Sequence, residues 1–522
     1  MARSLDKSYH RFSLKPLASV PLLFSLLIFV LFLFPILVFP IVSLTGMAFG
    51  ELQHGNFIFS PYLLNTIEFS LIQSFLSTLL SAVLGVGVAL YVIENGRGRG
   101  SWIWRLSLIS FSLPSLVVVL ALLSFWGREG LGFSIFGYPG ILLCHVAMNY
   151  PVFMKLVGES WLASGVEEEC TALSLGAGRF RTFVSVTFPK LKSSLFKAGL
   201  LCFTYCFCSF IPVAVLGGNP SFSTIELGIY QALKFENNLS KAAVLSLLQL
   251  ILLFPLFLAF QRTQKNKITA TFQKRIQIFQ FSKTTSWIVW VILGAIVIGI
   301  SFGPLVLVVA KSVFAFESQL SEIWDAFLNS AKLAGLCVML VLPVGFAGAY
   351  LERHFKILSP FIPYAMVVPL FIPVMFLTAA FSGAFPELIE SFRDSFWAVA
   401  VIQMTIALPL VYRSLLSGFE SIPRDVEWVA ISLGASQTDL LRDVEIPLLR
   451  RFIFLAIGLA ICFSLGEVSS LLLFGSSQGA TLSLLVFQKL GKYAVQDANL
   501  VAGVLICLMA LILWSIEKCN PS

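Results

Sequence analysis

The chain has 522 residues, of which 58% are hydrophobic and only 12% are charged, and its mean hydropathy is +0.91. Soluble domains carry about 25% charged residues, so this composition excludes an ordinary soluble protein and predicts that most of the chain lies in a bilayer. The formal net charge of +8 does not indicate a nucleic-acid interface, because the basic residues occur in short segments between apolar runs, as in membrane proteins of fixed orientation.

Twelve apolar runs are long enough to span a bilayer, for which about 20 residues are needed. The first run follows a basic N-terminal segment, but it is longer than a signal peptide and lacks a small-residue cleavage site, so we expect it to be retained. The predicted fold is therefore an all-α polytopic membrane protein. The runs, six on each side of a polar stretch, are 17–47, 64–93, 103–126, 139–163, 195–216 and 240–261, then 287–314, 329–351, 358–383, 396–416, 452–474 and 496–516.

The distribution of Lys and Arg predicts the orientation of these runs. With the N-terminus in the cytoplasm, most of the 35 Lys and Arg residues fall in cytoplasmic segments, whereas the reverse orientation would invert this bias. We therefore expect both termini to be cytoplasmic.

One polar segment occurs twice, with each residue of the second copy 258 positions after its match (427 − 169). A glycine in each copy allows a tight turn or a close approach, and a proline stands where the next helix begins. Both copies fall on the predicted cytoplasmic side, so we expect a helix–turn–helix at the membrane surface that docks a partner, the alternative being a solvated connector. The matched residues are Glu169, Ala172, Leu175, Gly176, Ala177 and Pro189 in the first copy, and Glu427, Ala430, Leu433, Gly434, Ala435 and Pro447 in the second.

The repeat extends beyond these loops, because Tyr91 matches Tyr350 and Gly217 matches Gly475 at nearly the same spacing. A spacing held over this length indicates an internal duplication. Each copy contains six predicted helices, an even number, so the copies are parallel rather than inverted. The predicted domains are a first half (1–261), a basic cytoplasmic linker (262–286) and a second half (287–522).

The sequence predicts neither a catalytic site nor a metal or cofactor site. Gly491 and Lys492 are not followed by Ser or Thr and lack the upstream glycine of a phosphate-binding loop, so ATP hydrolysis would need another subunit. Cys202, Cys206 and Cys208 lie in one apolar run and are interpreted as packing residues. The chain is therefore predicted not to be an enzyme.

The duplicated segment resembles the EAA loop of ABC-importer permeases, whose short coupling helix fits a groove on the ATPase. The resemblance implies two copies of a cytoplasmic ABC ATPase, a periplasmic substrate-binding protein that delivers a small-molecule cargo, and a bacterial inner membrane location. One feature departs from the family pattern. The residues six positions before each glycine are Cys170 and Trp428, and the glutamates come one position earlier.

The fused, double-length layout resembles the permeases for thiamine and for ferric iron. Several stretches are more similar to the thiamine type, which implies thiamine or its phosphates as cargo and leaves ferric iron as the alternative. A different class, an ion-coupled secondary transporter, would predict inverted repeats and several embedded charges. The stretches that favour thiamine are 124–130, 140–145, 201–210, 216–218, 229–236, 472–475 and 487–493.

One carboxylate, Glu467, lies deep within a predicted span. Embedded carboxylates are costly and usually functional, so Glu467 is a candidate pathway residue, although a structural hydrogen bond is an equal alternative. Its counterpart in the first half is Ser209, and Tyr205 offers an aromatic surface nearby in the sequence. A cationic, aromatic cargo such as thiamine would suit a pathway with these side chains.

Overall fold

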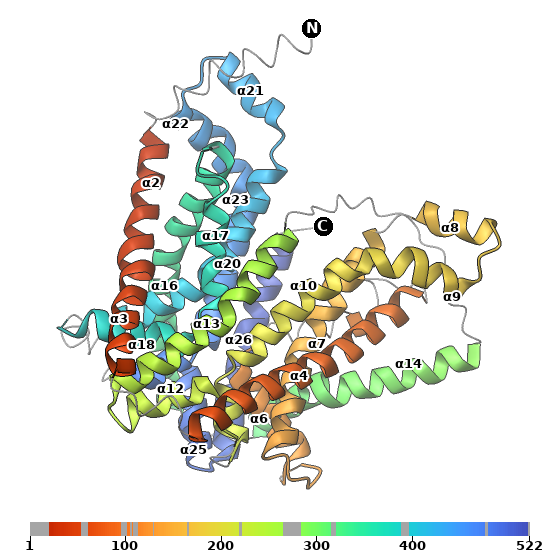
Figure 1. Cartoon of the computed structure of the whole chain (residues 1–522), viewed down its shortest axis with the longest axis vertical. Coiled ribbons are helices and arrows are strands. Elements are labelled where there is room, and N and C mark those ends of the chain that lie inside the picture. The colour runs from red at the N-terminus through yellow and green to blue at the C-terminus, as the bar shows by residue number, and fades with distance from the viewer. Residues whose placement is uncertain are drawn as a thin grey trace. The chain divides into compact units, whose positions relative to one another are not determined.

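A computed structural model describes residues 20–53, 61–94, 102–104, 107, 113–128, 130–163, 166–218, 222–264, 283–314, 320–355, 357–387, 396–474 and 479–519. Every regular element in these ranges is a helix (Figure 1). The fold is therefore all-α, as the sequence predicts. The predicted linker lies mostly outside the described residues.

The helices of the first half begin with a long hydrophobic rod that contains a π-helical turn, and they end with another long helix. In order they are α2 (Val20–Phe32), η2 (Leu33–Val38), α3 (Phe39–Gln53), α4 (Pro61–Glu94), α6 (Ser115–Trp126), α7 (Tyr138–Ala163), α8 (Val166–Ser174), α9 (Arg179–Thr182), η4 (Phe183–Thr187), α10 (Phe188–Phe207), α11 (Ile211–Leu216), α12 (Ile225–Lys234) and α13 (Leu239–Gln264).

The second half repeats this order, with a π-helical turn again in its first rod. Its elements are α14 (Lys283–Val297), η6 (Ile298–Phe302), α15 (Gly303–Phe314), α16 (Leu320–His354), α17 (Ile362–Val367), η7 (Val368–Phe371), α18 (Val374–Ala384), α20 (Trp397–Ser421), α21 (Arg424–Ser432), α22 (Gln437–Asp439), η8 (Leu440–Glu445), α23 (Ile446–Gly466), α24 (Ser469–Phe474), α25 (Leu482–Gly491) and α26 (Val495–Cys519).

The long helices could cross a membrane. Among the described residues, nine are long and apolar enough, or ten when the bent pair Ile362–Phe371 and Val374–Ala384, which turns by 104°, counts as one span. The helices α6 and α10 do not meet this test, but their counterparts α18 and α23 lie in segments that do. Adding these two to the ten gives the twelve spans that the sequence predicts.

The chain divides into two compact units that do not coincide with the two sequence halves. Unit 1 comprises residues 1–47, 324–481 and 507–522, and unit 2 comprises residues 48–323 and 482–506. The first rod of each half thus belongs mainly to the unit built from the other half. The division at 262–286 stays a prediction about the sequence repeat, and it is not the boundary of these units.

Within unit 2, the π-helical turn η6 of the exchanged rod contacts α6. A π-helical turn shifts the backbone hydrogen-bond pattern, and here the Gly299 carbonyl accepts a hydrogen bond of 2.9 Å from the Trp126 indole N–H on α6. Further along the rod, the Trp102 and Trp290 rings meet edge to face at 5.7 Å.

Each half packs two of its long helices together at a glycine. On Gly85 of α4, a Cβ would clash with the Tyr150 carbonyl oxygen of α7, so only glycine allows this approach of the two backbones. On Gly345 of α16, a Cβ would lie 2.8 Å from the Val411 side chain of α20. These packed pairs fix the directions of α7 and α20, which lead directly into the two repeated loops.

Candidate functional site

The repeated polar segments form the same series of elements. We call residues 166–190 the first loop and residues 424–448 the second loop. Each contains a nine-residue helix (α8 or α21), a turn, a short helix (α9 or α22), a π-helical turn (η4 or η8) and the start of a long helix. Figure 1 shows α8 and α9 beyond the end of α7, and α21 and α22 beyond the end of α23.

The turn of the first loop explains why its small residues occur where they do. Gly176 has φ +84°, a left-handed conformation that strongly favours glycine. Its amide donates to the Leu173 carbonyl and the Ala177 amide donates to the Ala172 carbonyl, both at 3.0 Å. These two bonds are the Schellman cap that closes a helix C-terminus.

The turn of the second loop has the same geometry. Gly434 has φ +93°, its amide donates to the Ile431 carbonyl at 3.0 Å, and the Ala435 amide donates to the Ala430 carbonyl at 3.1 Å. A Cβ on either turn glycine would meet no atom within 4 Å. The glycines are therefore required by backbone conformation and not by packing within the chain.

Both loops expose apolar side chains. Leu175 and Leu433, which directly precede the turn glycines, are 83% and 84% exposed. Phe180 in the first loop and Val429 and Ile431 in the second are exposed as well and were not predicted. Val429 lies four residues, about one helical turn, before Leu433, and this spacing in a charged segment was the available signal. Exposed apolar groups clustered at a helix tip are typical of a protein-binding surface.

The first loop is closed by a hydrogen bond within itself. Glu169 is 1% exposed, and its carboxylate accepts a hydrogen bond of 2.7 Å from the Thr187 hydroxyl at the end of η4. On the surface, Lys190 and Glu168 form an ion pair at 2.7 Å. The predicted loop glutamate therefore faces inward and holds α8 against η4.

The second loop is tied to a different helix. Arg353, at the end of α16, donates to Glu427 at 2.5 Å and to the Ile422 carbonyl at 3.0 Å. His354 Nε2 lies 2.9 Å from Glu445 Oε1, and the Glu445 side chain is 1% exposed. Glu445 is therefore buried against α16 and is not part of the charged surface of this loop.

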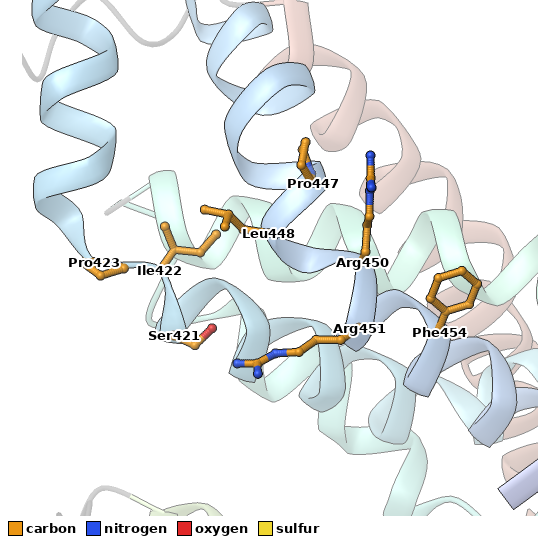
Figure 2. A pocket seen from close by; sticks show the side chains of 8 residues that line it. All are labelled: Ser421, Ile422, Pro423, Pro447, Leu448, Arg450, Arg451 and Phe454. Atoms are coloured by element: carbon orange, nitrogen blue, oxygen red, sulfur yellow. The ribbon is translucent and has the colours of Figure 1, made fainter. Parts of the chain in front are cut away.

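Each proline is the second residue of a long helix that continues from a π-helical turn. Pro189 lies in α10, just after η4, and Pro447 lies in α23, just after η8. Beside Pro447, where α20 ends and α23 begins, a pocket of about 620 Å³ opens at the base of the second loop (Figure 2). It is lined by Ser421, Ile422, Pro423, Pro447, Leu448, Arg450, Arg451 and Phe454.

The candidate pathway residues lie at matching breaks between helices. Glu467 follows the last residue of α23, and its carboxylate accepts hydrogen bonds from the Ser469 amide at 2.6 Å, the Ser470 amide and the Ser470 hydroxyl. These bonds cap α24, which supports the structural alternative. Ser209 lies in the equivalent break after α10, and Tyr205 is half-buried on α10 in unit 2.

A second embedded carboxylate escaped the sequence analysis. Glu226 in the first turn of α12 is fully buried, and it accepts a hydrogen bond of 2.9 Å from the Gln249 amide on α13. Sequence reasoning missed it because α12 is too short to be recognised as a span. The helix-capping Thr224 just before it was the available signal.

Residues 340–516 match the family described as binding-protein-dependent transport system inner membrane component. The chain is 29% identical to the thiamine transport system permease protein ThiP of Haemophilus influenzae, over 89% of this chain and 90% of that protein. It is also 29% identical to ThiP of Escherichia coli, over 88% and 89% of the two chains. A putative 2-aminoethylphosphonate transport system permease protein, PhnV of Salmonella typhimurium, is 24% identical over only 37% of this chain.

The chain resembles the fused thiamine permeases along most of its length. This confirms the predicted resemblance, which rested on the duplicated loops and on short stretches in both halves. The family match covers the second loop and the helices around it, from within α16 to within α26. Together with the long apolar helices, it supports a multi-pass membrane protein with the type I permease fold.

Proposed function

We propose that this chain is the permease subunit of a binding-protein-dependent ABC importer for thiamine or its phosphates. The observation that carries the proposal is the presence of two loops with the same capped turn and the same exposed leucine in one chain. Similarity to ThiP proteins over nearly the full length supports thiamine as the cargo class.

In this proposal, each loop docks one copy of a cytoplasmic ABC ATPase, which hydrolyses the ATP. The exposed Leu175 and Leu433 would enter an apolar groove on that partner, and the left-handed glycines would keep the turns tight enough to fit. The two halves, 1–261 and 287–522, would be joined by the basic linker 262–286. The Lys and Arg bias supports a cytoplasmic location for the loops, the linker and both termini, with the chain in the bacterial inner membrane.

The mechanism that follows is alternating access. A periplasmic binding protein would deliver cargo to the outer side of the helices. Closure of the two ATPases on ATP would move α8 and α21, and the packed pairs α4–α7 and α16–α20 would carry this motion into the membrane. The chain itself supplies the pathway and the docking loops.

Glu467, Ser209 and Tyr205 remain proposed pathway residues. Because the Glu467 carboxylate caps α24, Glu467→Gln keeps an acceptor oxygen but removes the negative charge. If the charge serves a cationic cargo, the variant should lose transport while retaining bound ATPase and normal thermal stability. Equal loss of stability and transport would assign Glu467 a structural role only.

The experiment that tests the proposed function is reconstitution of the chain with its ATPase and binding protein in proteoliposomes. We expect thiamine-loaded binding protein to stimulate ATP hydrolysis and uptake of labelled thiamine. Stimulation by iron-loaded binding protein alone would show that the cargo is ferric iron and not thiamine. Thiamine uptake driven by an ion gradient without ATP would support a secondary transporter.

A further inference from the structure

The last three residues of α16 form a cluster that holds the second loop. Each side chain contacts a different segment around that loop, so one helix end is connected to three elements. We call this cluster the α16 clasp. Its contacts are Glu352 with the Tyr412 hydroxyl of α20, Arg353 with Glu427 of α21, and His354 with Glu445 of η8.

The clasp is shielded from water. The side chains of Arg353 and Glu427 are 12% and 15% exposed, and those of His354 and Glu445 are 18% and 1% exposed. Partly buried charge pairs are screened much less by salt than exposed ones. Arg353 also donates to the Ile422 carbonyl, at the residue where α20 gives way to α21. One guanidinium thus fixes both the start of the loop and its leading helix.

The first half carries different residues at the matched positions. With the spacing that matches Tyr91 to Tyr350 (350 − 91 = 259), Arg353 corresponds to Glu94 and His354 to Asn95. The matched pair in the first half would be two acids, Glu94 and Glu169, so the Arg353–Glu427 ion pair is not repeated at these positions.

We propose that the α16 clasp makes α16 and the second loop move as one body, so that the second ATPase drives the membrane helices through α16. This rests on the proposed function, because it assumes that the second loop is pushed by an ATPase. Arg353 and His354 are then positioning residues for coupling. In the first loop, the hydrogen bond between Glu169 and Thr187 joins α8 to η4, which continues into α10.

The test measures thiamine transported per ATP hydrolysed by the reconstituted complex of chain, ATPase and binding protein. Arg353→Glu and Glu427→Arg are made singly and together. Each single variant should lower this ratio by about fivefold or more, the size of an ordinary allosteric coupling. The swapped double variant should recover most of it, because the opposite charges meet again. Bound ATPase and thermal unfolding are measured in parallel.

The matched control is Glu322→Gln, which removes an ion pair of 2.8 Å with Lys489 at the other end of α16. It should leave the ratio unchanged. Single variants that bind ATPase and keep the wild-type ratio would overturn the proposal. If a single variant fails to assemble, the swapped double variant provides the test. A restored ratio of thiamine transported to ATP hydrolysed would support the proposal. An assembled complex with a low ratio would contradict it. Absence of thiamine-stimulated hydrolysis in the wild type would instead refute the proposed function.

Discussion

The first and second loops share their turn but differ in how they are anchored. Both end a nine-residue helix with a left-handed glycine and the same pair of cap hydrogen bonds. The first loop is closed by a bond between a buried carboxylate and a hydroxyl, whereas the second is tied to α16 by the Arg353–Glu427 ion pair and by the contact of His354 with Glu445. At matched positions, Thr187 has become Glu445, and Glu169 and Glu427 have acquired different partners.

The two loops show which features a duplicated surface keeps and which it loses. The part that would face a partner is fixed by local backbone geometry and is the same in both copies. The part that faces the rest of the chain depends on neighbouring helices and has diverged. Two identical ATPases would then meet similar turns that are connected differently to the membrane helices.

The largest expected effect comes from the shared turn. Gly176→Val and Gly434→Val force a β-branched residue into the left-handed region, which costs up to about 3 kcal/mol. Since no atom lies near either Cβ position, backbone strain is the whole cause within the chain. We expect each variant to lose bound ATPase in co-purification.

Asparagine tolerates the left-handed region better than valine, so Gly176→Asn and Gly434→Asn are the controls and should retain more ATPase. Gly176→Asp and Gly434→Asp add a charge in the same conformation and test the partner groove directly. If both valine variants bind as much ATPase as the wild type, the turns are not needed for docking.

A smaller effect should come from the anchor of the first loop. Thr187→Val removes the hydroxyl that donates to the buried Glu169 carboxylate, and we expect a loss of about 1–2 kcal/mol in unfolding free energy. The control is Thr171→Val on the exposed side of α8, where the hydroxyl bonds only to a carbonyl of its own helix. Thermal unfolding of the purified chain measures both. Equal effects would show that Glu169 does not depend on Thr187.

The smallest effect should come from the surface charges. The side chains of Lys190 and Glu168 are 31% and 65% exposed, so Glu168→Gln should change assembly by under about 1 kcal/mol. The effect should shrink as salt is raised. The exposed Arg442–Asp443 pair belongs to the second loop alone, so neutralising it should alter ATPase affinity differently. ATPase affinity is measured by titration at several salt concentrations. Equal changes in affinity that do not depend on salt would contradict the expectation that the two loops differ.

The sequence predicts the features that depend on local pattern. A Leu-Gly-Ala triplet after a polar helical segment predicts a capped turn, and its recurrence with constant spacing predicts a second one. Long apolar runs predict helices whatever their neighbours are. These signals are contained within a few residues, so they need no knowledge of tertiary contacts.

The rest depends on contacts between distant segments. Nothing near Glu445 in the sequence identifies His354 as its neighbour, and a glutamate in a charged segment gives no sign that it is buried. The exchange of the first rods between the two compact units also has no local signal, because it involves contacts between segments far apart in the sequence, such as Trp126 and Gly299. Glu226 was missed because a short buried helix lacks the length of a span.

If one chain presents two docking loops, the mass of the purified complex should show two bound partners. Native mass spectrometry of the chain with its cognate ATPase should give one copy of the chain and two of the ATPase. Gly434→Val should reduce this to one ATPase, held by the first loop. A wild-type complex with a single ATPase, or a variant that still binds two, would contradict the account.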